Sequence, residues 1–238
     1  MTTLFISDLH LDDSRPEATG LFCQLVEEEA RQAAALYILG DLFEYWLGDD
    51  VLSDTARQVA NALAGLSKAG MPVYFMHGNR DFLLGEDYAR LCGMKLLPEE
   101  QCIELYGEPT LLLHGDTLCT DDTAYQAVRR RLRSPGWQAG FLAQPATDRI
   151  AFARDAMQQS KQHKMSVSMD IMDVNHDAVV AAFARHGVRE MIHGHTHRPA
   201  IHELEVAGHR ARRTVLGDWY EQGSVLRVDE YGTDLAQL

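Results

Sequence analysis

The sequence reads His193-Gly194-His195-Thr196-His197-Arg198-Pro199 directly after an apolar run, residues 188–192, that is typical of a buried strand. The glycine permits a tight turn here, and the proline that follows ends regular structure. His195 and His197 are therefore placed just beyond a strand end, where ligands collect in α/β proteins, and imidazole is a common metal ligand. A His-x-His pair alone is a weak signal, so the prediction of a metal site depends on similar residues elsewhere.

Four more short apolar runs end in polar side chains of the same kind. The runs are residues 3–6, 36–39, 73–76 and 110–113. They are followed, in order, by Asp8 with His10, by Asp41, by Asn79 and by His114. Each residue alone has an ordinary explanation as a helix cap, a turn residue or a packed core histidine. Five strand ends that repeat the pattern favour a shared site instead.

The seven side chains form a donor set suited to two metal ions. Strands that pair in one sheet through helical crossovers bring their carboxyl ends to one edge, so we expect the seven groups to converge. Four imidazoles, two carboxylates and one carboxamide are too many ligands for one tetrahedral zinc ion and suit two ions that share a ligand. The set contains no thiolate, and its mixed nitrogen and oxygen ligands suit manganese, iron or zinc better than magnesium alone.

Composition excludes some classes of protein. At 238 residues the chain is long enough for one large domain or two small ones, and a hydrophobic content of 46% allows a sizeable core. The formal charge of −13 disfavours a nucleic-acid binder. The chain has no basic leader and no apolar stretch near the ~20 residues that span a bilayer. We therefore expect a cytoplasmic protein that can still lie on a membrane surface.

Residues 122–168 differ in character from the rest of the chain. Between residues 123 and 168, eight arginines and lysines occur with only two aspartates, Asp148 and Asp155. The segment has a helical pattern that breaks at residues 134–136 and at Pro145, so we interpret it as a positively charged helical insertion. Other helices are expected from Pro16, over residues 55–68 and 86–91, and between Asn175 and Gly187. Closing antiparallel strands are expected at residues 200–206, 213–216 and 225–228.

Five motifs occur along the chain in a characteristic order. They are Asp8-x-His10, Gly40-Asp41, Gly78-Asn79-x-Asp81, His114-Gly115-Asp116 and Gly194-His195-x-His197. In this order they resemble the calcineurin-like metallophosphoesterases, and the resemblance covers most of the chain. It implies an α/β fold, a two-sheet β sandwich flanked by helices, in a single domain over residues 1–238 with a helical cap at about 122–168. It also implies that Asp8, His10 and His197 hold one ion, that Asn79, His114 and His195 hold a second, and that Asp41 bridges the two.

Arg80 departs from a pattern common in this superfamily. Many members have a histidine between the asparagine and the aspartate of the third motif, where it can protonate an alkoxide leaving group. A guanidinium stays protonated and is a poor proton donor, although it can hold a phosphate with two hydrogen bonds. A leaving group that needs no proton is itself a phosphate. We therefore expect hydrolysis of a phosphoanhydride rather than of an alkyl phosphate ester.

Longer stretches narrow the resemblance to one family. Residues 6–11, 37–44, 77–83, 114–120 and 192–199 are similar to the UDP-2,3-diacylglucosamine pyrophosphohydrolases, and the similarity runs essentially end to end. It implies cleavage of UDP-2,3-diacylglucosamine to lipid X (2,3-diacylglucosamine 1-phosphate) and UMP, by water attack on the UMP phosphorus, in lipid A biosynthesis. It also implies two Mn²⁺ ions and a peripheral position on the cytoplasmic face of the inner membrane, against an anionic lipid surface.

The same resemblance implies roles for individual residues. The catalytic residues would be Asp41, Asn79, Arg80 and His195. Substrate contacts would come from Asn79, Arg80, Asp122, Ser160, Lys164 and His195. A lysine expected at position 167 is Val167 in this chain, which calls one phosphate or sugar contact into question.

The insertion and the activity each have alternatives that the sequence leaves open. The apolar residues of the insertion either line a channel for acyl chains or pack a small core of their own. They are Trp137, Phe141, Leu142, Ile150, Phe152 and Met157. A broader nucleotide pyrophosphatase or phosphodiesterase would need no acyl chain. A degenerate scaffold would have lost metal ligands and is disfavoured, because all seven are present; no nucleic acid and no obligate protein partner is expected.

Overall fold

The computed structural model describes the backbone of residues 1–166 and 173–238 and the side chains of residues 1–158 and 173–238. The strands are β1 (Thr3–Ile6), β2 (Ala35–Leu39), β3 (Val73–Met76), β4 (Lys95–Leu97), β5 (Glu100–Leu105), β6 (Glu108–Leu113), β7 (Glu190–His193), β8 (Ala200–Val206), β9 (His209–Val215), β10 (Ser224–Asp229) and β11 (Gly232–Gln237). The first sheet has the order β11-β10-β1-β2-β3-β4, and the second has the order β5-β6-β7-β9-β8. Pairing is parallel from β1 to β4, and β10 pairs antiparallel with β1.

Helices begin and end where the local sequence favours it. They are α1 (Pro16–Glu28), α2 (Asp54–Lys68), α3 (Glu86–Cys92), α4 (Thr123–Leu132), α5 (Pro135–Leu142), α6 (Ala146–Ser166) and α7 (His176–His186), with the short turns η1 (Ala30–Gln32) and η2 (Asp116–Leu118). The Ser53 hydroxyl accepts the Ala56 N–H at the start of α2, and the Asn175 side chain accepts the Ala178 N–H at the start of α7. Gly187 ends α7 in the left-handed conformation, with φ 64°.

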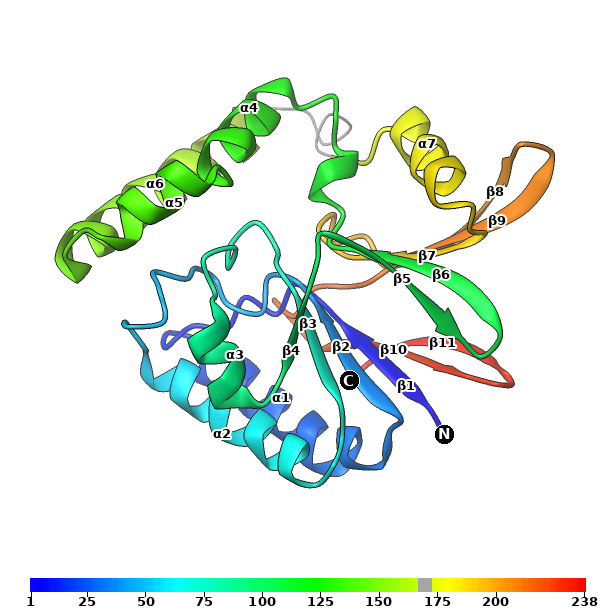
Figure 1. Ribbon diagram of the computed structural model, residues 1–238, viewed down its shortest axis with the longest axis horizontal. Helices are drawn as coiled ribbons and strands as arrows, with labels where there is room; N and C mark the ends of the chain where they lie inside the picture. Colours follow the sequence, from blue (N-terminus) through cyan, green and yellow to red (C-terminus); the bar gives the residue numbers. More distant parts are fainter. Residues whose placement is uncertain (167–172) are drawn as a thin grey trace.

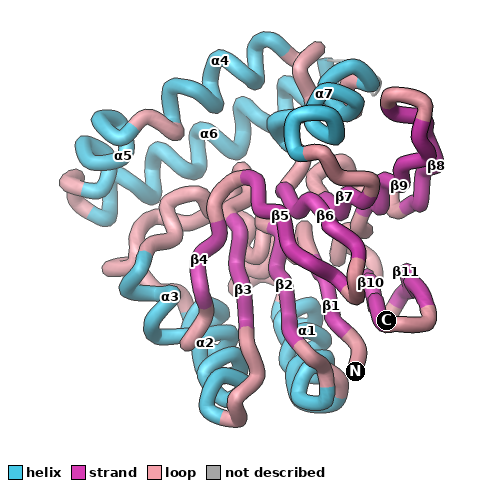
Figure 2. The backbone as a smooth tube through the Cα atoms, turned by 45° about the vertical axis from the view of Figure 1, so that its right-hand side comes forward, coloured by secondary structure: helices cyan, strands magenta, loops and turns pink. Residues whose placement is uncertain are grey.

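The two sheets pack face to face between outer layers of helices, as predicted. Helices α1, α2 and α3 cover the outer face of the first sheet, and α7 lies on the second sheet (Figures 1 and 2). Alternation along β1 divides the core, because Leu4 and Ile6 pack toward the helices whereas Phe5 packs with residues of the second sheet, including Leu112 and Ile192. This is the expected two-sheet sandwich flanked by helices.

Two expectations about the strands were wrong. The five strands that precede the candidate ligands do not share one sheet: β1, β2 and β3 lie in the first and β6 and β7 in the second. Their ends still meet, because the sheets converge there and the His195 N–H donates to Asp8 Oδ2 across the junction at 2.8 Å. Strand β9 is antiparallel to β8 but parallel to β7. Strands β4, β5 and β11 were not predicted.

The insertion forms helices α4, α5 and α6, which lie together beyond the ends of the first-sheet strands (Figure 1). Arg149 of α6 is 2% exposed and fastens the insertion to the loop before α2, where it contacts the Leu47 carbonyl and the Asp50 carboxylate. Phe141 is buried in the core that also contains α1–α3, and its ring lies 5.2 Å from that of Phe152. Phe152 is 40% exposed, so the apolar residues of the insertion both pack a core and reach the surface.

No helix within the described residues is both long enough and apolar enough to cross a membrane.

Candidate metal centre

The loops after the strands hold strained backbone conformations. Seven non-glycine residues have positive φ in the described parts of the chain, and five of them are predicted ligands: Asp8 (56°), His10 (50°), Asp41 (53°), His195 (70°) and His197 (56°). Non-glycine residues in this left-handed region cost free energy and cluster at functional sites, where the surrounding structure holds them. Such strain at the convergence of the strand ends supports a functional site there.

The first group of donors contains Asp8, His10 and His197, whose ligand atoms lie within 4.8 Å of one another. The Nδ1 atoms of the two rings face carboxylates: His10 Nδ1 lies 2.8 Å from Glu44 Oε2, and His197 Nδ1 lies 3.2 Å from Asp218 Oδ2. Protons on the Nδ1 atoms leave the two Nε2 lone pairs facing each other at 3.4 Å. Asp8 Oδ1 is buried beside them without a hydrogen bond of acceptable geometry among the described residues. A divalent cation fits this set, because it would satisfy all three atoms.

The second group contains Asp8, Asp41 and His114, again within 4.8 Å. His114 Nδ1 lies 2.8 Å from the Leu39 carbonyl oxygen and so carries the donating N–H. The Nε2 atom then points at Asn79 Oδ1, 3.1 Å away. Two acceptor atoms at this distance require a proton or a metal ion between them, so this group also fits a cation.

Asp41 belongs to the second group and also faces the first. Its Oδ2 is 3.8 Å from His10 Nε2, and its Oδ1 is 3.8 Å from His114 Nε2. Oδ1 also accepts the Arg80 N–H at 2.8 Å. The His195 ring lies 5.1 Å from the His114 ring. The structure therefore brings all seven sequence-predicted residues into one cluster, with one carboxylate oxygen of Asp41 toward each side.

The pKa values in the cluster follow from burial and charge. Burial would raise the pKa of Asp8, but the interaction with His197 and the charges of the nearby imidazoles lower it well below its usual range. Burial and the charge of His114 lower the pKa of His195 to about 3, so its imidazole is neutral at neutral pH. Burial opposes a proton on His197, but the carboxylates of Asp218 and Asp8 raise its pKa to about 10. A metal ion at this position would displace that proton.

Two supporting residues, Glu44 and Asp218, were missed at the sequence level. Glu44 follows Asp41 by three residues in the same loop, and that spacing was the available signal. Asp218 comes from the loop after β9, far along the chain, and nothing in the sequence pairs it with His197.

Asp81, a residue of the third predicted motif, is buried. It accepts backbone N–H groups from Gly78 at 2.9 Å and from Leu42 at 2.7 Å, so it connects the loops that carry Asn79 and Asp41.

The structure describes the side chains of only some of the predicted substrate contacts. The Arg80 side chain is 16% exposed at the cluster, with Nη1 3.8 Å from Glu44 Oε1. Asp122 caps helix α4 by accepting the Tyr125 N–H at 2.8 Å. The side chains of Ser160 and Lys164, and all of Val167, lie outside the described residues.

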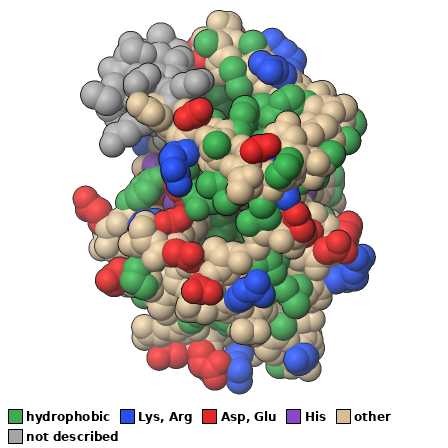
Figure 3. Space-filling view, turned by 90° about the vertical axis from the view of Figure 1, so that its left-hand side faces the viewer, with side chains coloured by type: hydrophobic (Ala, Val, Ile, Leu, Met, Phe, Trp, Pro, Cys, Tyr) green, Lys and Arg blue, Asp and Glu red, His purple; other side chains and the backbone are tan. Residues whose placement is uncertain are grey.

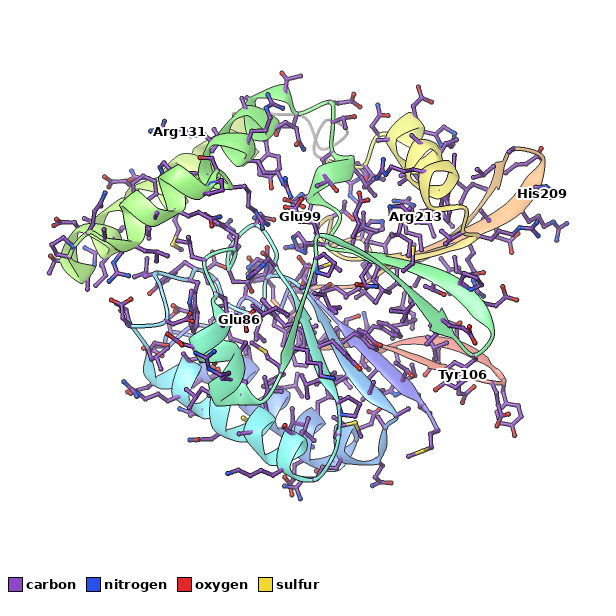
Figure 4. All side chains as sticks on the ribbon, in the orientation of Figure 1. Glu86, Glu99, Tyr106, Arg131, His209 and Arg213 are labelled. Carbon is purple, nitrogen blue, oxygen red and sulfur yellow. The ribbon has the colours of Figure 1, made fainter. Side chains whose placement is uncertain are left out.

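Two cavities lie outside the cluster of seven residues, although the second borders it through Thr196 and Arg198, on either side of His197. One of about 230 Å³ opens between the sheets near Tyr106, at the tip of the β5–β6 hairpin, and another of about 200 Å³ lies beside Arg213 on β9. Figure 4 labels Tyr106 and Arg213. Neither is lined by a predicted ligand. We place the candidate active site at the cluster, because the chemistry of the donors is there.

Comparison with known proteins identifies the family. The family model described as calcineurin-like phosphoesterase matches residues 1–199. The chain is 58% identical to a protein of Stenotrophomonas maltophilia named UDP-2,3-diacylglucosamine hydrolase, over 100% of this chain and 99% of that protein. It is 55% identical to a protein of the same name from Xanthomonas axonopodis, with the same coverage. A solved archaeal phosphodiesterase is similar over 100% of both chains at 13% identity and a TM-score of 0.49.

The matched residues contain all seven members of the cluster, from Asp8 to His197. A phosphoesterase family with a two-metal site agrees with the paired donor groups and with the acceptor atoms that face each other. The chain belongs to the calcineurin-like phosphoesterases and, within them, to the family of the UDP-2,3-diacylglucosamine hydrolases.

Proposed function

We propose that this chain is a metal-dependent hydrolase that cleaves the pyrophosphate bond of UDP-2,3-diacylglucosamine. The products would be UMP and lipid X, formed by water attack on the UMP phosphorus, in lipid A biosynthesis. The observation that carries the proposal is the cluster of seven donors with the Arg80 guanidinium beside it, in a chain 58% identical to a hydrolase named for this substrate.

Each residue of the cluster has a proposed task. Asp8, His10 and His197 would hold one ion, Asn79, His114 and His195 a second, and Asp41 would contact both. The chemistry that two bound divalent ions supply is activation of water and neutralisation of charge on the phosphoryl oxygens. Manganese is proposed as the ion, because four imidazoles and three oxygen donors suit it better than magnesium.

Arg80 is proposed to hold the phosphate groups of the substrate. Its backbone N–H is fixed by Asp41 Oδ1, and its guanidinium is kept at the cluster by the Glu44 carboxylate 3.8 Å away. A guanidinium binds phosphate in a bidentate manner but donates no proton to a leaving group. This matches a leaving group that departs as a phosphate, and with it a phosphoanhydride substrate.

The insertion is proposed to be a cap on a single catalytic domain and to meet the lipid part of the substrate. Val128, Leu142, Ile150 and Phe152 are apolar residues of the insertion that are at least 40% exposed. Hydrophobic side chains gather where the upper and lower parts of the molecule meet on the face seen in Figure 3. The basic residues of the insertion would attract an anionic membrane surface, with ~1 kcal/mol per arginine or lysine near such a surface. A peripheral position on the cytoplasmic face of the inner membrane follows from this proposal.

The test is UMP release from UDP-2,3-diacylglucosamine with added Mn²⁺, with a chelator, and with the deacylated analogue as the matched substrate. We expect metal-dependent release that falls steeply when the acyl chains are absent. Equal turnover of the deacylated analogue would indicate a broader nucleotide pyrophosphatase. No release with any divalent ion would overturn the proposal.

A further inference from the structure

Helix α4 presents one stripe of side chains to the metal centre. Tyr125, Gln126, Arg129 and Arg133 have the spacing of one helix face. The Tyr125 ring lies 6.0 Å from the His195 ring, and Gln126 Nε2 donates to the carbonyl oxygen of Asp116 at 2.8 Å. The contacts of this stripe extend along α4 to Arg133, one residue beyond its end.

The strongest contact joins Arg129 to Asp116. Arg129 Nε lies 2.6 Å from Asp116 Oδ2, and the Tyr125 hydroxyl donates to the same oxygen at 2.8 Å. Asp116 is buried and lies two residues after His114, in the turn that places the His114 ring. Arg129 also pairs with Glu99, which lies between the second sheet and α4, at 2.6 Å (Figure 4). Movement of α4 would therefore disturb the loop of His114.

A second contact joins the end of α4 to the loop of Asn79. Arg133 Nη2 donates to the Gly78 carbonyl oxygen at 2.8 Å, and the guanidinium lies 5.2 Å from the centre of the Phe82 ring. Gly78 directly precedes Asn79. The stripe thus contacts His195 and the loops of Asn79 and His114, which are the three ligands proposed for the second ion.

The first ion's ligands are held by other parts of the chain. The Ser7 hydroxyl donates to Asp8 Oδ2 at 2.6 Å, and Glu44 and Asp218 face the rings of His10 and His197. All three supporting residues belong to the strand-end loops of the catalytic core, and none of these contacts comes from the insertion. The two halves of the metal centre therefore have different mechanical supports.

We propose that Arg129 and Arg133 are positioning residues through which docking of α4 and binding of the second metal ion stabilise each other. The inference rests on the proposed two-ion site and adds a coupling between the cap and one ion of the pair. Linkage makes the effect reciprocal: a docked α4 raises affinity for the second ion, and that ion holds α4 in place. A positioning role of this kind typically changes metal affinity by about 10- to 100-fold.

The experiment measures Mn²⁺ binding to the full chain by equilibrium dialysis, with the wild type, Arg129→Lys, Arg133→Gln and Arg131→Gln side by side. Arg129→Lys keeps the charge beside Asp116 but loses the fork of N–H donors. Arg133→Gln removes the bond to the Gly78 carbonyl, the contact with the Phe82 ring and the ion pair with Glu99 at 3.6 Å. We expect both variants to weaken the second binding step about tenfold or more while the first step changes less than about twofold. Arg131 is exposed on the side of α4 that faces away from the body (Figure 4), so Arg131→Gln should bind as the wild type does.

Hydrogen exchange of the wild type gives an independent reading of the same coupling. Added Mn²⁺ should slow exchange in α4 and leave α1, on the far side of the first sheet, unchanged. The inference would be overturned if the variants bound both ions equally weakly or bound the second ion as tightly as the wild type does. It would also be overturned if Mn²⁺ did not change the rate of hydrogen exchange in α4. Failure of the proposed function looks different: two ions would bind with the expected differences among variants, but no UMP would be released.

Discussion

The carboxylate of Glu44 lies 2.8 Å from Nδ1 of His10, on the side of the ring opposite the Nε2 atom that faces His197. A carboxylate in this position fixes the orientation and tautomer of a metal-binding imidazole and raises its basicity. Glu44 Oε1 also lies 3.8 Å from Arg80, so one side chain supports both a proposed metal ligand and the proposed phosphate-binding group.

Glu44→Gln should weaken binding of the first ion by about 10- to 100-fold, because an amide holds the His10 ring less firmly and contributes no charge. The measurement is a competition of the full chain with a fluorescent chelator for Mn²⁺. Glu27→Gln is the matched control, because Glu27 is 63% exposed and, among the described residues, forms an ion pair only with Arg31. Affinities that are equal in Glu44→Gln and the wild type would show that Glu44 does not orient His10.

Gly194→Ala should destabilise the protein, because an added Cβ would lie 2.2 Å from Asp8 Oδ2 and 2.2 Å from Ser7 Oγ. Neither atom can move freely, since Ser7 donates to Asp8 and Asp8 accepts the His195 N–H. We expect a loss of about 1–3 kcal/mol in the free energy of unfolding, the range for overpacking a filled site. Urea denaturation measures it.

Gly140→Ala is the control for that substitution. No described residue lies within 4 Å of a Cβ added at Gly140, which is inside α5, so alanine should raise stability by up to ~1 kcal/mol through helix propensity. If Gly194→Ala were as stable as Gly140→Ala, the close packing of the His195 loop on Asp8 would be incorrect.

The sequence predicted strands best where an apolar run was short and bounded by turn residues. β1, β3 and β8 have the bounds expected from their residues, whereas β4 has only three residues, Lys95–Leu97, and gives no periodic signal. β5 alternates between half-buried and exposed positions at a sheet edge, so few of its residues are apolar enough to stand out. Assignment of strands to one sheet or two depends on tertiary pairing, which local sequence does not encode.

In the candidate site too, local sequence predicted some residues, whereas others depend on tertiary packing. The seven donors could be predicted, because each follows a strand and the strand ends of an α/β protein converge. The contact between Asp218 and His197 could not, because it joins loops whose approach depends on the packing of both sheets. The stripe of α4 was read only as positive charge, yet Arg129 and Arg133 are directed inward to Asp116 and Gly78.

Protonation of Glu100 should lower the stability of the protein in acid. Burial raises the pKa of Glu100, but the contacts with His186 and Arg185 outweigh it, so the pKa in the folded state lies below the ordinary value of 4.5. A lowered folded pKa means that the stabilisation is fully present above pH ~4.5 and is lost as the pH falls through the folded value. Glu100→Gln should therefore cost about 1 kcal/mol at neutral pH and progressively less in acid.

Urea denaturation across that range of pH measures the effect, with Glu221→Gln as an exposed control. A difference between Glu100→Gln and the wild type that stays constant down to the lowest pH would mean that the carboxylate is not the source of the stabilisation.

Arg80 offers the sharpest test of the reaction class. Arg80→Ala should lower kcat/KM for the pyrophosphate substrate by ~10²–10³, because it removes the cation that is proposed to meet the developing phosphoryl charge. Mn²⁺ content should not change, since the Arg80 contact with Asp41 runs through the backbone N–H, which alanine keeps.

Arg80→His should also lose pyrophosphate cleavage, because a neutral imidazole cannot hold phosphate in the same bidentate manner. The assay compares UMP release with cleavage of a simple alkyl diester, each with the wild type and both variants. If Arg80→His kept full pyrophosphate cleavage while the wild type hydrolysed the diester equally well, another group would be protonating the alkoxide leaving group, and the inference of a phosphoanhydride substrate from Arg80 would fail.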